Sequence, residues 1–256
     1  MLHSTITLSE NKKIYFASDF HLGVPSASTS LEREKKVVRW LQKVSQDAQE
    51  IYLVGDIFDF WFEYKHTIPK GYIRFLGELA RITDCGIQVH FFAGNHDMWM
   101  FDYFTDQMGI QVIRKPISLS INNLDIMVGH GDGLGPGDHK YKLLKRIFEN
   151  RVCQWAFARL HPNFGIGLAK RWSKSSRVAS SENEEVYLGE KEYLVQFCKS
   201  QEIVKHHDYY IFGHRHLPLD VEIGINSRYI NLGEWVNNFT YAELDGKTIK
   251  LKKFED

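Results

Sequence analysis

The chain has 256 residues, 43% of them hydrophobic, and its 32 Lys and Arg residues balance 32 Asp and Glu residues. This length suits one α/β unit with a substantial core, and the balanced charge gives no overall field that would attract nucleic acid. Three widely spaced cysteines, the absence of a signal-peptide pattern and the lack of an apolar run near the ~20 residues of a membrane span favour a cytoplasmic protein. We therefore expect a single cytoplasmic domain over residues 1–256.

Five hydrophobic runs along the chain predict buried parallel β-strands, and polar side chains follow each run directly. The runs, in chain order, are Ile14–Ser18, Ile51–Val54, Val89–Ala93, Ile126–Val128 and Tyr209–Phe212. The blocks that follow them are Asp19-Phe20-His21, Gly55-Asp56-Ile57-Phe58-Asp59, Gly94-Asn95-His96-Asp97, Gly129-His130-Gly131-Asp132 and Gly213-His214-Arg215-His216. The loops after parallel strands gather at one edge of a sheet, where α/β proteins bind their ligands. The sequence therefore predicts that the five blocks meet at one site.

Other segments predict helices and further strands. Ser30 to about Gln46 and Tyr72–Ile82 carry apolar residues at helical spacing among charged ones, which indicates amphipathic surface helices. Toward the C-terminus, three segments alternate with turn residues and predict antiparallel strands that close a second sheet: Tyr229–Leu232, Phe239–Leu244 and Ile249–Lys253.

The segment from Gly133 to about Ser200 departs from this pattern. The glycines and proline of Gly133–Gly137 exclude regular structure there. Asp138 suits the N-cap of a helix from Tyr141 to Arg159, which Pro162 would end. Phe164–Trp172 predicts a second helix, and the pattern Ser181-x-x-Glu184 is a capping box that would open a third.

We expect these helices to form an insertion over about residues 134–200. Its apolar side chains are expected either to pack on the sheets or to form a lid beside the site. A mixture of apolar and basic residues suits an anionic amphiphile or a membrane surface, and the basic residues are Lys140, Lys142, Lys145, Arg146, Arg151, Lys170, Arg171, Lys174 and Arg177.

The polar blocks contain seven potential metal ligands, which are Asp19, His21, Asp56, Asn95, His130, His214 and His216. Two divalent ions about 3.5–4 Å apart need a bridging carboxylate, and Asp56, presented by a glycine-preceded turn, is the natural bridge. Nitrogen and oxygen donors without thiolate favour Mn²⁺, Fe or Zn²⁺. Each block by itself is compatible with an ordinary turn, but their conjunction at five strand ends favours a two-metal site that accepts an anionic phosphate ester.

The order of these blocks resembles that of the calcineurin-like metallophosphoesterase superfamily, and the match extends from Asp19 to His216. The resemblance implies a four-layer α/β/β/α sandwich with a dinuclear metal centre, to which the helical insertion expected above would add a lid. It further implies that one ion is bound by Asp19, His21, Asp56 and His216. The other ion would be bound by Asp56, Asn95, His130 and His214.

Within this superfamily the chain is similar to the UDP-2,3-diacylglucosamine hydrolases. The likeness rests on Gly55–Trp61, on His130-Gly131-Asp132 with the charged insertion after it, and on His214–Pro218. Those enzymes cleave the pyrophosphate bond of UDP-2,3-diacylglucosamine during lipid A synthesis and release UMP and diacylglucosamine 1-phosphate. That family commonly carries Arg at the position of His96 and Glu at that of Asp59. The resemblance implies a nucleotide-linked glycolipid as substrate and peripheral contact with the inner membrane surface.

The resemblance also suggests roles for residues outside the ligand set. His96 is expected to protonate the leaving group or to stabilise charge in the transition state, with Asp97 holding its other ring nitrogen. Asp138, Ser173 and Arg177 fall where the family contacts the sugar and its phosphate. A groove for two acyl chains would then be lined by Leu144, Phe148, Trp155, Phe164, Ile166 and Leu168.

Two other functions remain compatible with the sequence. A metallophosphoesterase that acts on another phosphodiester or nucleotide would use the same ligands. A non-catalytic interaction scaffold on the same fold would be expected to have lost ligands, whereas all seven positions are filled here.

Overall fold

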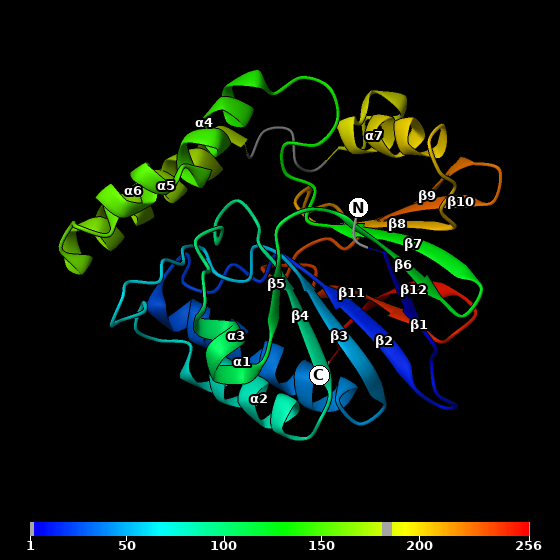
Figure 1. Ribbon diagram of the computed structural model, residues 1–256, viewed down its shortest axis with the longest axis horizontal. Helices are drawn as coiled ribbons and strands as arrows, with labels where there is room; N and C mark the ends of the chain where they lie inside the picture. The colour runs from blue at the N-terminus through cyan, green and yellow to red at the C-terminus, as the bar shows by residue number, and fades with distance from the viewer. Residues whose placement is uncertain (1–2, 181–185, 256) are drawn as a thin grey trace.

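Two six-stranded sheets pack face to face in the computed structural model, which describes residues 3–180 and 186–255 (Figure 1). The first sheet contains, in spatial order, β12 (Ile249–Lys253), β11 (Thr240–Leu244), β2 (Lys13–Ala17), β3 (Ala48–Val54), β4 (Gln88–Phe92) and β5 (Gln111–Ile113). The second contains β1 (His3–Ile6), β6 (Ile117–Ile121), β7 (Leu124–Gly129), β8 (Tyr209–Phe212), β10 (Ser227–Asn231) and β9 (Leu219–Gly224).

The central strands carry runs of successive hydrophobic residues, such as Ile14–Ala17 in β2 and Ile51–Val54 in β3, because both of their faces are covered. In β2, Ile14 and Phe16 point into the cluster between the two sheets, whereas Tyr15 and Ala17 point into the cluster under the helices. Side chains alternate across a strand, so successive residues of β2 belong to two different clusters and both sets are apolar.

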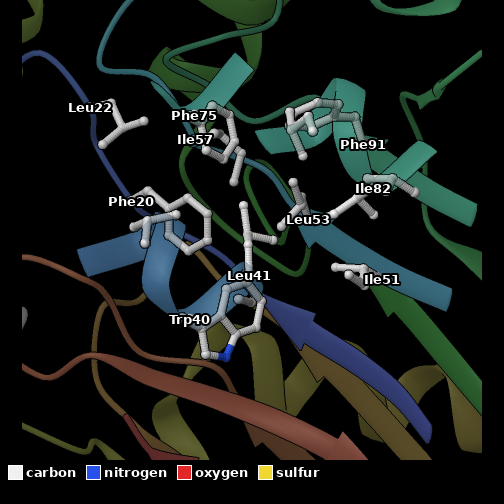
Figure 2. Packing of buried hydrophobic residues seen from close by; sticks show 14 of the residues in the cluster. Phe20, Leu22, Trp40, Leu41, Ile51, Leu53, Ile57, Phe75, Ile82 and Phe91 are labelled. Atoms are coloured by element: carbon white, nitrogen blue, oxygen red, sulfur yellow. The ribbon is translucent and has the colours of Figure 1, made fainter. Parts of the chain in front are cut away.

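Helices cover the outer face of each sheet. On the first sheet these are α1 (Ala27–Val44), α2 (Ile73–Asp84) and α3 (Tyr103–Met108), and on the second it is α7 (Tyr193–Glu202). Figure 2 shows Leu41 of α1 near Leu53 of β3, and Phe75 of α2 beside Ile57, within the cluster that also contains Trp40. The layers therefore follow the order α/β/β/α, which confirms the expectation from the resemblance to the metallophosphoesterases.

The five predicted strands before the polar blocks are all present, as β2, β3, β4, β7 and β8. However, β2, β3 and β4 are neighbours in the first sheet, whereas β7 and β8 are neighbours in the second. The expectation of one sheet edge is therefore wrong. Within each sheet these strands are parallel, so their carboxyl ends gather where the two sheets adjoin.

The three C-terminal strands do not close one second sheet, which corrects another expectation. β10 lies in the second sheet, parallel to β8 and antiparallel to β9. β11 and β12 extend the first sheet, where β11 pairs antiparallel with β2. Hydrophobic alternation predicts a strand but does not identify its partner, and partner choice depends on which edge the chain reaches.

The insertion forms α4 (His139–Glu149), α5 (Arg151–Phe157) and α6 (Pro162–Ser180), a helical group that projects beyond the sheets in Figure 1. The predicted helix from Tyr141 to Arg159 is broken at Asn150, whose side chain accepts hydrogen bonds from the first turn of α5. Pro162 begins α6 and does not merely end the preceding helix, since proline is favoured at the first helical position. Asp138 precedes α4, but its side chain makes no capping hydrogen bond.

The predicted capping box at Ser181 and Glu184 lies outside the described residues. The chain returns through the short helix η1 (Gly189–Lys191) to α7. Within residues 3–180 and 186–255, no helix combines the length and the apolar character that crossing a bilayer requires.

Candidate metal centre

Seven side chains from five loops converge where the carboxyl ends of strands from both sheets adjoin. The ligand atoms of one group all lie within 4.8 Å of one another, and so do those of a second group. The first group is Asp19, His21, Asp56 and His216, and the second is Asp56, His130 and His214. Asn95 joins the second group, since its Oδ1 lies 3.2 Å from His130 Nε2. The structure thus brings together all seven candidate ligands, and Asp56 belongs to both groups.

Most of these residues have a left-handed backbone, which residues other than glycine rarely adopt. The φ angles are 56° at Asp19, 44° at His21, 52° at Asp56, 67° at His214 and 54° at His216. Hydrogen bonds between the loops support these conformations: the Asp19 N–H donates to Gly55 O, and the His214 N–H donates to Asp19 Oδ2 at 3.0 Å. Strained backbone costs about 1–3 kcal/mol per residue and collects at functional sites.

Two glycines permit the close approach of these loops. A Cβ at Gly94 would lie 2.2 Å from Asp56 Oδ1, and a Cβ at Gly213 would lie 2.5 Å from Asp19 Oδ2. Both carboxylates are buried. Any side chain before Asn95 or His214 would therefore displace a candidate ligand.

The buried carboxylates of Asp19 and Asp56 make the electrostatic potential of the site favourable for cations. Asp19 Oδ1 is buried and, within residues 3–180 and 186–255, has no hydrogen-bond partner, a costly arrangement that a bound metal ion would satisfy. Burial by itself would raise the pKa of Asp56, but the charges of His130 and His96 outweigh it and hold this pKa well below its usual range. The site therefore keeps Asp56 as a carboxylate.

The charged groups of the site also shift the pKa values of His130 and His214. Burial lowers the pKa of His130, yet Asp56 more than compensates and raises this pKa to about 10. A positive charge is thus favoured at His130, and a divalent ion would provide it on replacing the proton. Burial and the neighbouring His130 lower the pKa of His214 to about 4, which keeps this imidazole neutral, as metal ligation requires. The set of nitrogen and oxygen donors fits a divalent metal pair.

Surrounding groups orient the candidate ligands. His130 Nδ1 lies 2.9 Å from Val54 O, so it donates there and directs Nε2 toward Asp56 Oδ2, 3.4 Å away. The Arg33 guanidinium, on α1, donates to His21 O at 2.8 Å. Arg33 was not predicted from the sequence, since nothing in the pattern of α1 connects it with a loop 12 residues earlier.

His96 is oriented by Asp59 and Ser173, which corrects the expected partnership with Asp97. His96 Nδ1 lies 3.1 Å from Asp59 O and 3.1 Å from Ser173 Oγ, and Ser173 donates to Asp59 Oδ1 at 2.9 Å. Asp97 is fully buried and instead accepts hydrogen bonds from the N–H groups of Gly94 and Ile57, both at 2.8 Å. Asp97 therefore shapes the turn that presents Asp56.

Of the three substrate contacts expected on the insertion, Ser173 lies near the metal centre and Asp138 is exposed. Ser173 of α6 reaches the centre through Asp59 and His96. Asp138 is exposed at the start of α4, with a φ of 48°. Arg177 lies on α6, and its side chain falls outside the described part of the structure.

Two anchors attach α4 to the rest of the molecule. Tyr141 and Lys145 both donate to Asp132, a buried carboxylate two residues after His130, at 2.5 and 2.7 Å. Farther along, Trp99 Nε1 donates to Phe148 O at 2.9 Å. The sequence analysis did not predict that Asp132 anchors α4. Its position two residues after the candidate ligand His130 was the one feature of the sequence that placed it near the metal centre.

A cavity of about 110 Å³ lies between α4, α6 and the metal centre. Its wall combines the polar groups of Asn95, His96 and Ser173 with apolar side chains, which are Phe60, Met98, Trp99, Leu144, Phe148 and Ala169. Of the residues expected to line an acyl groove, Leu144 and Phe148 do so, whereas Trp155, Phe164 and Leu168 are exposed, with 60%, 64% and 49% of their surface accessible.

Residues 12–218 match the family model of the calcineurin-like phosphoesterases. The UDP-2,3-diacylglucosamine hydrolase of Porphyromonas gingivalis is 35% identical to the chain, with 95% of this chain and 98% of that protein covered. A UDP-2,3-diacylglucosamine hydrolase from Shewanella baltica is 21% identical, covering 93% of this chain and 95% of the relative. Among solved structures, the phosphoesterase Yfce from E. coli is 16% identical, covers 94% of this chain and 92% of its own, and has a TM-score of 0.43.

Proposed function

This chain belongs to the calcineurin-like phosphoesterase family and is a metal-dependent hydrolase, and on that basis we propose that its substrate is UDP-2,3-diacylglucosamine. The products would be UMP and diacylglucosamine 1-phosphate, as in lipid A synthesis. The observation that carries this proposal is the 35% identity with the Porphyromonas gingivalis hydrolase over nearly the whole of both chains.

We propose that Asp19, His21, Asp56 and His216 hold one divalent ion. Asp56, Asn95, His130 and His214 would hold the other, and Asp56 would bridge the pair. When bound, such ions neutralise phosphate charge and activate water at neutral pH. We propose Mn²⁺ as the physiological metal, with Fe and Zn²⁺ as the alternatives that the same donors accept.

His96 is the proposed catalytic residue among the side chains outside the ligand set. Its Nδ1 is held by Asp59 and Ser173, which leaves Nε2 for a phosphate or leaving-group oxygen. A proton held at Nε2 would move to the departing oxygen or stabilise its charge. Because Ser173 lies on α6, movement of the insertion would change the orientation of His96.

The insertion is proposed to act as a lid over about residues 134–200. Leu144 and Phe148 of α4 line the cavity beside His96, and an acyl chain there would bury apolar surface at about 0.8 kcal/mol per methylene. Asp138, Ser173 and Arg177 are the proposed polar contacts to the sugar and its phosphate.

The proposed function is tested by two substrates in parallel. Purified protein with Mn²⁺ should hydrolyse UDP-2,3-diacylglucosamine in detergent micelles with a kcat/KM at least about a hundredfold above that for bis-p-nitrophenyl phosphate. Turnover of the small phosphodiester without turnover of the glycolipid would favour the alternative, a phosphodiesterase with another substrate. Inactivity toward both, despite stoichiometric metal, would favour a scaffold.

We also propose peripheral contact with the cytoplasmic face of the inner membrane. Exposed apolar side chains are concentrated on the insertion, namely Leu143, Ile147, Val152, Trp155, Phe164 and Leu168. Such side chains beside basic ones suit the surface of an anionic bilayer. Val152→Asn/Trp155→Asn should weaken sedimentation with phosphatidylglycerol vesicles, whereas Ile203→Asn/Ile225→Asn, at residues that are even more exposed but lie outside the insertion, should not.

A further inference from the structure

A second and larger cavity, of about 720 Å³, borders the metal centre and is strongly basic. It reaches Gly94 and His130 in the centre itself. Six basic residues contribute to its wall, namely Arg114, Lys115, Lys142, Lys145, Arg146 and Arg151, against two acidic ones, Asp132 and Glu149. The whole chain has a formal net charge of zero, so this cavity is a local concentration of positive charge.

Three of these basic groups are already engaged. Lys145 pairs with Asp132 at 2.7 Å, Lys142 Nζ donates to Gly135 O at 2.6 Å, and Arg114 Nη1 donates to Met98 O at 2.9 Å.

The other three are not engaged. Within residues 3–180 and 186–255, Lys115, Arg146 and Arg151 form no ion pair or hydrogen bond through their side chains, and all three are exposed. Positive charge around a concave site attracts anions, and unpaired guanidinium and ammonium groups are suited to phosphate.

α4 separates this basic cavity from the apolar one beside His96. Tyr141, Leu144 and Phe148 face the apolar cavity, while Lys142, Lys145, Arg146 and Glu149 face the basic one, as expected for two faces of one helix. Met98 lines both cavities. The metal centre therefore has an apolar cavity at Asn95 and His96 and a basic cavity at His130.

We propose that the basic cavity binds the nucleoside monophosphate half of the substrate, the part that leaves as UMP. This inference rests on the proposed function, in which a pyrophosphate joins a nucleoside to a lipid-bearing sugar. The apolar walls of the smaller cavity suit the first part of a lipid chain, so the charged and polar nucleotide takes the other side of the centre. A volume of about 720 Å³ is ample for a nucleotide, since small-molecule sites span about 300–1,000 Å³. Lys115 and Arg146 are the proposed phosphate and ribose contacts.

The test measures UMP as an inhibitor of bis-p-nitrophenyl phosphate hydrolysis by the metal-loaded enzyme. In K115Q/R146Q the inhibition constant of UMP should rise at least about tenfold through loss of two charge-assisted contacts. K115R/R146K should remain within about threefold of the wild type. The matched control, K247Q/K253Q, removes the same charge from two exposed residues at the β11–β12 hairpin and should leave the constant unchanged. Inorganic phosphate, which would bind at the metals, should inhibit all four proteins equally.

Each contrary outcome has a distinct meaning. An unchanged UMP constant in K115Q/R146Q would overturn the inference, and if this variant instead lost binding to phosphatidylglycerol vesicles, the basic surface would be a membrane contact. An equal rise for inorganic phosphate would also overturn it, because the centre itself would then be weakened. Failure of the proposed function is separate: the wild type would not hydrolyse UDP-2,3-diacylglucosamine, yet UMP would still lose affinity in K115Q/R146Q.

Discussion

Single residues carry most of the chemistry that we propose for the metal centre. Asp56 belongs to both groups of candidate ligands. Asp97 accepts hydrogen bonds from the turn that presents Asp56, and Gly94 leaves room for the Asp56 carboxylate because it has no side chain. His96 lies in the loop after β4 and contacts the insertion through Ser173. Metal binding is therefore proposed to depend on Asp56 and proton transfer on His96, and a substitution of either residue tests one role alone.

Asp56→Ala should lose both metal ions and all hydrolytic activity, since it removes the bridge and leaves two dications without a shared anion. Asp59→Ala is the matched carboxylate control, because Asp59 contacts His96 and Ser173. It should retain metal and lose only part of the rate. Elemental analysis of both variants measures this, and two ions retained in Asp56→Ala would contradict the bridging role.

His96→Gln should lower kcat by roughly 10²–10⁴-fold, the usual contribution of a general acid or base. Glutamine keeps a polar group of similar reach but cannot transfer a proton, so metal content and KM should change little. Steady-state kinetics together with metal analysis distinguishes this role from a structural one. If kcat is unchanged, His96 serves only to hold the turn.

At the scale of elements, a buried ion pair ties α7 to the loop that carries two candidate ligands. Arg215 Nε lies 2.7 Å from Glu192 Oε1, and Arg215 Nη2 also donates to Val186 O at 2.9 Å. Arg215 lies between His214 and His216, and Glu192 precedes the first residue of α7. The return from the insertion is thereby coupled to the position of both histidines.

Arg215→Met should lower the free energy of unfolding by about 3–5 kcal/mol, since it leaves the fully buried Glu192 carboxylate without its partner. The double variant Arg215→Met/Glu192→Leu should recover much of this loss, because no uncompensated charge remains. Urea denaturation of the three proteins measures the difference. A loss below about 1 kcal/mol in the single variant would mean that water reaches Glu192.

The insertion is the element on which the choice of substrate is proposed to depend. Leu144→Asn/Phe148→Asn makes the apolar cavity polar and should lower kcat/KM for UDP-2,3-diacylglucosamine at least about tenfold, given ~0.8 kcal/mol for each methylene that is no longer buried. Hydrolysis of bis-p-nitrophenyl phosphate should continue, and the control Ile203→Asn, 88% exposed at the end of α7, should affect neither. Equal losses on both substrates would indicate that α4 merely stabilises the sandwich.

For the whole molecule, stability should depend on acid pH through Glu202. Burial opposes its charge, but hydrogen bonds donated by Tyr210 OH at 2.6 Å and His207 N at 3.0 Å outweigh it and lower the pKa of Glu202 to about 2. The ordinary value is 4.5. The stabilisation is therefore complete above pH 4.5 and is lost as the pH falls toward 2.

Glu202→Gln should accordingly be less stable than the wild type at pH 7, by about 1–2 kcal/mol after allowance for solvent screening. The difference between the two proteins should shrink between pH 4.5 and pH 2. Unfolding by urea at several pH values measures this. A difference that is constant over that range would show that the carboxylate charge contributes nothing.

The local features of this protein were predictable from its sequence. Hydrophobic runs and helical spacing are properties of neighbouring residues, and they correctly predicted the strands before the polar blocks and the helices α1 and α2. The polar blocks also follow their strands directly, so a strand's end determines where its block lies. The sequence by itself therefore predicts that Asp19, Asp56 and His130 each lie at the carboxyl end of a strand, whereas the packing of the two sheets brings His130 to the other two.

Tertiary structure alone decided which strands pair and which side chains meet. The strands divide between two sheets because partner choice depends on packing between distant segments, and the β11–β12 pair joined β2 for the same reason. His96 Nδ1 contacts Ser173, 77 residues later, and not its neighbour Asp97. The Asp97 carboxylate instead accepts a hydrogen bond from the Ile57 N–H in the loop after β3. The basic cavity likewise combines α4 with the β5–β6 loop. Such contacts depend on the whole chain, since a buried polar group takes whichever partner the packing brings within reach.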